Sequence, residues 1–276
     1  MEEMPSICRH LFLGFRLFLA SAFVAICFVP PHGSAEPVPA THKQGSMHGF
    51  LLLKSEEGKV IAIGDETNIA RGDEIRSRLT FHFRDGSIDD ETTTFRQGSV
   101  FQVIRDHHIQ KGPSFPQPLD MTVNGSAGEV TWREEKDGKS EVKVEHMDLP
   151  TDLANGMMPL TVENFSTKAS ELKVSYVVIN SKPRVVKLSI KPDGEDRTFI
   201  GGVGRRAIRY RVHVEIGGVA GVIAPVMGNQ PSDTKLWILD GDVPALIKME
   251  GALYEKGPIW TMVLTSPTWP SNPRRK

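Results

Sequence analysis

Apolar and polar side chains alternate with a period of two along most of the chain. In residues 74–84, Phe81 and Phe83 fall on one side of a predicted strand, and arginines fall on the other. Residues 207–216 alternate in the same way. This period is typical of strands in a sheet that buries one face. Roughly a dozen short strands of this kind, separated by tight turns, predict a mainly antiparallel sheet.

One stretch, residues 148–160, carries helix signals instead. Capping residues and a proline suited to a first helical turn stand at its start. Leu153, Met157 and Leu160 are spaced to share one helix face. Gly156 and Pro159 predict a break at 158–159, so the helix is expected to be short, with at most one more turn to residue 164.

These elements predict a mainly β fold, because an open sheet of that many strands curls. We expect a single domain at residues 46–265, built as a curled antiparallel sheet or incomplete β-barrel. The concave face of such a sheet needs a cover. The one short central helix is expected to act as its lid.

The N-terminus predicts a secretory signal peptide at residues 1–35. Arg9 and Arg16 precede an apolar run at 17–29, and small residues at 33–35 predict cleavage after Ala35, with Ala40 as second choice. The alternative is a membrane anchor, but the run is shorter than the roughly 20 residues of a span. We therefore expect a periplasmic or secreted protein without a transmembrane span.

The remaining ends of the chain are expected to be irregular. Residues 36–45 are polar and proline-rich and are expected to form a flexible leader, and residues 266–276 a disordered tail. The two cysteines, Cys8 and Cys27, both lie in the expected signal peptide. Disulfides and thiolate chemistry are therefore not expected in the processed chain.

Composition and motifs give little support to catalysis. The net charge of -1 argues against a nucleic-acid partner. The glycines of 202–207 match a dinucleotide motif, but a strand follows them where a helix is required. Asp89 and Asp90 are expected in a solvated turn, and the histidines, His107 and His108 included, on solvated surfaces. No cofactor or metal is expected, although a hydrolase with an unrecognised site stays an alternative.

Seven arginines fall on predicted strands: Arg76, Arg78, Arg84, Arg205, Arg206, Arg209 and Arg211. They are interpreted as a solvated sheet face that blocks edge aggregation. The alternative is contact with anionic lipid headgroups or polysaccharide.

An excess of apolar residues is the clearest functional signal. Residues 236–239 and 259–264 are apolar on both faces, so either both faces of these strands are buried or one face lines a cavity. One interpretation is core packing in a structural or adaptor protein of the cell envelope. The other is a site between sheet and helix for an acyl or lipid-like ligand. The residues expected to line it are Phe81, Phe83, Leu153, Met157, Met158, Tyr210, Val212, Trp237 and Trp260.

The chain also resembles a known group of proteins. Its connector reads Asp-Leu-Pro-Thr-Asp-Leu-Ala-Asn-Gly-Met at 148–157, and a Lys-Leu-Trp-Ile strand at 235–238 precedes Val-Pro-Ala-Leu-Ile-Lys at 243–248. This order is similar to uncharacterised bacterial envelope domains of unknown function, which in turn look like periplasmic lipoprotein-carrier half-barrels. The resemblance covers about residues 46–265. It implies a sheet curled around a helical lid, an envelope location with a lipid or envelope-protein partner, and no catalytic residues.

Overall fold

The computed structural model describes residues 37–265, except 137, 166–168, 201 and 216–229. The expected signal peptide and the expected tail lie outside the described residues. The described elements are β1 (Met47–Lys54), β2 (Val60–Arg71), β3 (Glu74–Phe83), β4 (Ile88–Gln97), β5 (Phe101–Lys111), β6 (Leu119–Asn124), β7 (Glu129–Lys136), β8 (Lys139–His146), α1 (Met158–Glu163), β9 (Leu172–Ile179), β10 (Pro183–Ile200), β11 (Val203–Glu215), β12 (Thr234–Leu239), β13 (Leu246–Gly251) and β14 (Trp260–Thr265).

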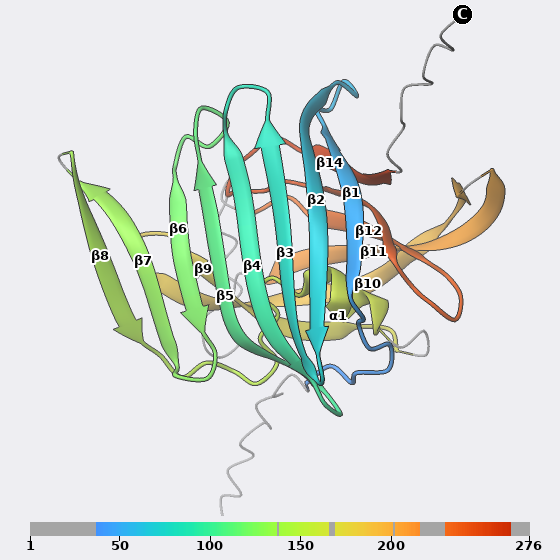
Figure 1. Ribbon diagram of the computed structural model, residues 1–276, viewed down its shortest axis with the longest axis horizontal. Helices are drawn as coiled ribbons and strands as arrows, with labels where there is room; N and C mark the ends of the chain where they lie inside the picture. The colour runs from blue at the N-terminus through green and yellow to red at the C-terminus, as the bar shows by residue number, and fades with distance from the viewer. Residues whose placement is uncertain (1–36, 137, 166–168, 201, 216–229, 266–276) are drawn as a thin grey trace, which may run out of the picture. The chain divides into compact units, whose positions relative to one another are not determined.

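The strands form one antiparallel sheet in the order β8-β7-β6-β5-β4-β3-β2-β1-β14-β13-β12-β11-β10-β9. Apart from β8 and β9, strands that follow one another in the sequence pair with each other, and the first and last strands, β1 and β14, join the two halves. The strands β8 and β9 are left as the two edges, so the sheet is not closed. The connection between these edges carries α1, which lies between the early strands in front and the later strands behind (Figure 1). The prediction of a curled antiparallel sheet with one short helix is confirmed.

The alternation of side chains explains how the sheet buries its inner face. On β3, Phe81 and Phe83 are buried, whereas His82 between them is exposed. Phe81 stands opposite Gly64 of β2, and a Cβ on that glycine would lie 2.6 Å from the phenylalanine ring. The glycine therefore makes room for the ring on the neighbouring strand.

The helix differs from the prediction in its start. Residues 150–157 form turns, and α1 begins at Met158, where a break was expected. Pro159 stands in its first turn, where the missing N–H of a proline is not needed. The break prediction was therefore wrong, because this proline begins a helix and does not interrupt one.

Buried apolar residues gather in two clusters. The larger cluster joins α1 and the stretch before it to both halves of the sheet, with residues such as Phe95, Val123, Leu160 and Leu236. The second cluster lies on β1–β3 and β14 and includes Leu53. It continues into a group of mutually contacting rings: Phe83, Phe115, Tyr254 and Trp260.

The stretch expected to be a flexible leader lies against the sheet and the helix. Val38 is buried, and its carbonyl accepts a hydrogen bond from the Phe101 amide at 3.0 Å. His42 and Asn164 exchange hydrogen bonds, since the His42 amide donates to Asn164 Oδ1 at 2.6 Å.

Candidate functional site

The concave face of the sheet is covered by residues 152–165, which we call the covering segment. One end of this segment is bound to β9 by a buried charged group. The Oγ of Ser175 donates to Oδ1 of Asp152 at 2.8 Å. The ammonium group of Lys187 then contacts both side chains, at 3.1 Å from Asp152 and 2.6 Å from Ser175. The carboxylate of Asp152 is therefore fully compensated although it is buried.

Asn155 continues this attachment along β9. Its side-chain amide donates to the Val177 carbonyl at 3.0 Å and accepts from the Val177 amide at 2.7 Å. Leu153 and Ser175 form a parallel bridge two residues earlier. The start of the covering segment thus satisfies backbone groups of the edge strand, as an added strand would.

The same segment reaches the opposite half of the sheet at Gly156. This glycine has φ +63°, and a Cβ placed on it would lie 1.8 Å from Thr93 Oγ1 on β4 and 2.6 Å from Asp106 Oδ1 on β5. Only glycine allows both the left-handed conformation and this close approach. Within a few residues, the segment crosses from the sheet edge to the inner face of β4 and β5.

The helix end of the segment is held by Glu163. Its carboxylate accepts from the Leu246 amide at 2.9 Å and from Gln44 Nε2 at 3.1 Å. Burial raises the pKa of Glu163 to about 7, although these hydrogen bonds act in the opposite direction. The Glu163 carboxyl group therefore changes between its neutral and its charged form near neutral pH.

Almost no space is left beneath the covering segment. The cavity between it and the sheet has a volume of about 10 Å³, near the minimum for one water molecule. It is lined by Val38, Phe101, Asp152, Leu153, Ala154, Met157 and Thr161. The structure is therefore closed at this position.

The residues predicted to line a ligand site fall into three places. Leu153, Met157, Tyr210 and Val212 belong to the larger core cluster, and Met158 packs against it. Phe81, Phe83 and Trp260 belong to the second cluster.

Trp237 lies apart from both clusters, on the other face of β12. Its Nε1 donates to Asp196 Oδ2 at 2.6 Å, and the ammonium group of Lys248 lies 4.2 Å from its ring centre. The guanidinium of Arg209 is 6.0 Å from the same ring. Trp237 is thus covered by charged side chains, which explains why β12 is apolar on both faces.

A group of polar side chains occupies the inner face of β4 and β5, next to Gly156. We call Asp89, Glu91, Asp106 and His108 the carboxylate cluster. Glu91 stands opposite His108 in the strand register. His108 Nε2 lies 2.7 Å from Asp89 Oδ1, and Thr93 donates to Asp106 Oδ1 at 2.8 Å.

Two carboxylate oxygens of this cluster have no hydrogen-bond partner within the described chain: Glu91 Oε1 and Asp106 Oδ2. Asp106 is fully buried. Burial raises the pKa of Glu91 to about 8 and also raises the pKa of Asp106, and repulsion between the two carboxylates adds to the shift at Glu91. A neutral acid at Glu91 is therefore favoured at neutral pH.

His108 behaves as the cation of the cluster. Burial alone would lower its pKa, but Glu91 and Asp89 outweigh this effect and raise the pKa to about 9. Burial, and then the carboxylates of Glu91 and Asp106, raise the pKa of Tyr176 of β9 well above its usual value.

The cluster can offer hydrogen bonds to a polar group, but it does not have the arrangement of a metal site. In the part of the chain that the structure describes, no three His, Cys, Asp or Glu side chains are grouped so as to hold a metal ion.

This cluster was not predicted from the sequence, for two reasons. Asp89 and Asp90 were expected in a solvated turn and His108 on a solvated surface, but the structure places all three in strands, and the side chains of Asp89 and His108 are only 9 % and 15 % exposed. Counting back by twos from buried Phe95 leads to Glu91 and Asp89, so a signal was present on β4. On β5, a bulge at Ile104 changes the parity, so no simple alternation leads to His108.

Most of the arginines expected on an open face are paired. Four of them contact carboxylates: Arg78 with Asp90, Arg206 with Glu195 and Asp240, Arg209 with Asp193 and Asp196, and Arg211 with Asp193. A general binding surface for anions along these strands is not supported by this pairing.

Comparisons of the sequence with models of protein families and with curated proteins find no match. Among the described residues, no helix has the length and apolar character to cross a membrane.

Proposed function

We propose that the protein is a non-catalytic binding protein of the periplasm or the extracellular space. In this proposal, an acyl or lipid-like ligand occupies the concave face when the covering segment moves away. The observation that supports this proposal is how small the covering segment is compared with the apolar face beneath it. In the described chain, a large apolar face with residues from both halves of the sheet is covered by a six-residue helix, the turns before it and the stretch around Val38.

Several features of the segment favour movement over permanent packing. Its attachments to β9 and β13 are polar contacts of Asp152, Asn155 and Glu163, which can exchange for water at a modest net cost of about 1 kcal/mol each. The apolar contacts of Leu153 and Met157 would be lost on opening. Burying roughly eight methylenes of a ligand contributes about 6 kcal/mol before association costs and can replace them.

The carboxylate cluster gives the proposed ligand a polar end. It lies beside Gly156, so it becomes accessible when the segment moves. Glu91 Oε1, which lies 3.9 Å from His108 Nδ1, and Asp106 Oδ2 have no hydrogen-bond partner among the described residues and can then bind a hydroxyl, amide or amine headgroup. An amphiphile with a hydrogen-bonding headgroup fits this arrangement better than a plain hydrocarbon.

The filled space under the segment favours a second candidate function. A cavity of about 10 Å³ is what a structural or adaptor protein with a permanent core would have. In that case the protein binds partners by its rim and carries no ligand.

Ligand binding with matched methionine variants separates the two candidates. The probe is cis-parinaric acid, which fluoresces when bound in an apolar site, and the protein begins at residue 36. Met157 and Met262 are equally buried, at 3 % exposure, but belong to different clusters. Met157→Gln and Met262→Gln should lower the melting temperature by similar amounts, and only Met157→Gln should weaken probe binding, by roughly tenfold or more. A wild-type protein that binds no probe, or equal weakening by both variants, favours the filled core.

A further inference from the structure

The hairpin of β10 and β11 extends past its neighbours in the sheet. β9 pairs with β10 only over Pro183–Ile190, and β12 pairs with β11 only over 207–212. The remaining pairs run from Arg197 opposite Arg206 to Ile200 opposite Val203, and no strand of the described chain pairs with them on either side. Figure 1 shows this end of the hairpin projecting as a two-stranded ribbon. Such a ribbon is only marginally stable by itself in water.

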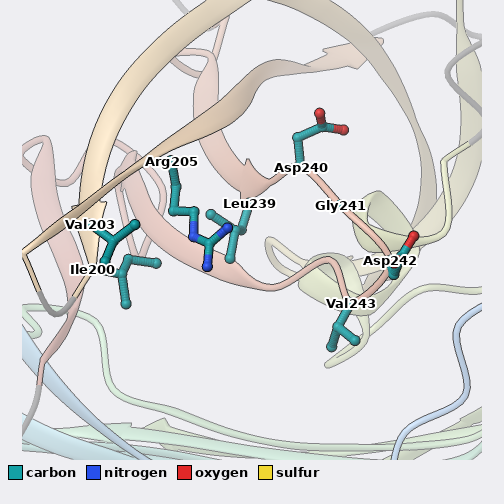
Figure 2. A pocket seen from close by; sticks show the side chains of 8 residues that line it. All are labelled: Ile200, Val203, Arg205, Leu239, Asp240, Gly241, Asp242 and Val243. Carbon is teal, nitrogen blue, oxygen red and sulfur yellow. The ribbon is translucent and has the colours of Figure 1, made fainter.

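The end of this ribbon is apolar and exposed. Phe199 is 68 % exposed, Ile200 43 % and Val203 54 %. Val243, from the loop after β12, is 79 % exposed and lies across a hollow from Ile200 and Val203 (Figure 2). Phe199 precedes Ile200 on β10 and therefore points to the other face of the ribbon. We call these four side chains the apolar tip, and exposed apolar side chains on both faces of a projecting ribbon indicate a contact surface.

A hollow of about 320 Å³ lies between the ribbon and the loop after β12. Ile200 and Val203 form one wall, Leu239 the floor and Val243 the far edge (Figure 2). The guanidinium of Arg205 extends into the hollow between them. The hollow therefore combines apolar walls with one cationic group, Arg205, and with the carboxylates of Asp240 and Asp242 on the loop side.

The arginines nearest the tip differ from those farther along the hairpin. Arg206, Arg209 and Arg211 are each paired with a carboxylate. Arg197 and Arg205 have no carboxylate partner among the described residues. Arg197 instead lies 6.0 Å from the ring centre of Phe199. Unpaired cations are thus placed directly behind the apolar tip.

We propose that this tip docks the protein onto an anionic lipid surface. Phe199, Ile200, Val203 and Val243 would enter the headgroup region, and Arg197 and Arg205 would contact lipid phosphates. Apolar side chains backed by arginines are the combination that binds such an interface. A protein partner is less suited, because a stable protein interface needs about 20–30 residues on each side. The hollow lies away from the concave face, so this inference does not depend on the ligand site.

Asp242 gives the proposal an additional test. It lines the hollow and has no cationic partner in the described part of the chain, whereas Asp240 is paired with Arg206. A negative charge at this position repels anionic lipid. Asp242→Asn should therefore strengthen docking. This variant removes only a negative charge and leaves the apolar side chains and the arginines of the tip unchanged.

The test is sedimentation with vesicles at physiological salt, with protein that begins at residue 36 and so lacks the apolar run of 17–29. This chain contains the whole described sheet and both core clusters. One set of vesicles contains phosphatidylglycerol and phosphatidylcholine, and the other phosphatidylcholine alone. The first set should bind the wild type, and the second at least tenfold less. Two double variants test the two parts of the tip: Phe199→Ser with Val243→Ser removes apolar side chains, and Arg197→Gln with Arg205→Gln removes the cations. Each should bind roughly tenfold to thirtyfold less, which for the arginine variant corresponds to about 1 kcal/mol per arginine.

The matched control removes exposed apolar residues elsewhere. Ile63 and Ile69 on β2 are 61 % and 52 % exposed, so Ile63→Ser with Ile69→Ser should bind as the wild type does. Three results would overturn the proposal: no binding of the wild type to anionic vesicles, equal binding to both vesicle types, or undiminished binding of the tip variant. A melting temperature for each variant shows that the fold is retained.

Discussion

At the scale of single residues, the carboxylate cluster links stability to pH. Glu91 keeps its proton in the folded state up to about pH 8, whereas in the unfolded chain it loses the proton near pH 4.5. Against the lowering effect of burial, the carboxylates of Glu91 and Asp89 raise the pKa of His108 above its usual value, so Glu91 and His108 titrate as one coupled pair. The folded state therefore binds more protons than the unfolded state between these values, and its stability falls as pH rises.

The first prediction follows from this decrease of stability with rising pH. The free energy of unfolding, measured with urea, should decrease between pH 5.5 and pH 9 by at least about 1.4 kcal/mol, which corresponds to one unit of pKa difference. Glu91→Gln should make this decrease smaller, because it removes the buried acid. It also removes the carboxylate that stands directly opposite His108 in the strand register. Glu255→Gln, at an exposed position, should leave it unchanged. A stability that rises over this pH range would contradict the assignment of a buried neutral acid.

At the scale of elements, the covering segment depends on one glycine. Gly156 combines a left-handed conformation with close contact to Thr93 and Asp106, so any side chain must push the segment away from β4. Gly156→Ala should lower the free energy of unfolding by about 2–4 kcal/mol, from backbone strain and overpacking together. The control is Gly98→Ala, since a Cβ at Gly98 would meet nothing within 4 Å. Equal melting temperatures of the two variants would show that the segment does not rest on β4.

The elements themselves could largely be predicted from alternation. Strands were predicted at 74–84 and 207–216, and the structure has β3 at Glu74–Phe83 and β11 at Val203–Glu215. Phe81 and Phe83 on β3, and Tyr210 and Val212 on β11, are buried as the alternation predicts. The covering segment was found by its capping residues, but its first half forms turns, because Asp152 and Asn155 bond to β9 and not to the next helical turn. Tertiary contacts of this kind leave no periodic signal in the sequence.

The candidate site was predictable only in part. Leu153, Met157, Tyr210 and Val212 lie in one cluster, although Leu153 and Met157 precede α1 and do not share the helix face that their spacing predicted. Trp237 faces the other side of the sheet, because Arg209 and Lys248 cover it with their charged groups. Its apolar neighbours alone could not reveal which face it takes.

At the scale of the whole molecule, the strand order explains why a cover is needed. The chain runs outward from β1 to one edge, crosses by the covering segment, and returns from β9 to pair with β1. The inner face is thereby shared by both halves, and the segment is bound to both. We propose that this segment opens to admit an apolar ligand.

A reversible cross-link tests this claim most directly. The chain from residue 36 onward contains no cysteine, so a pair can be introduced cleanly. The side chains of Asp152 and Ser175 are 2.8 Å apart at their oxygens, so Asp152→Cys with Ser175→Cys places two thiols at the attachment to β9. Binding of cis-parinaric acid is then measured in the oxidised and reduced protein, with Ser175→Cys alone as control. If the segment must move to admit a ligand, the oxidised pair binds no probe and reduction restores binding to the level of the control. Equal binding in the two states, or no binding in either state or in the control, would contradict it.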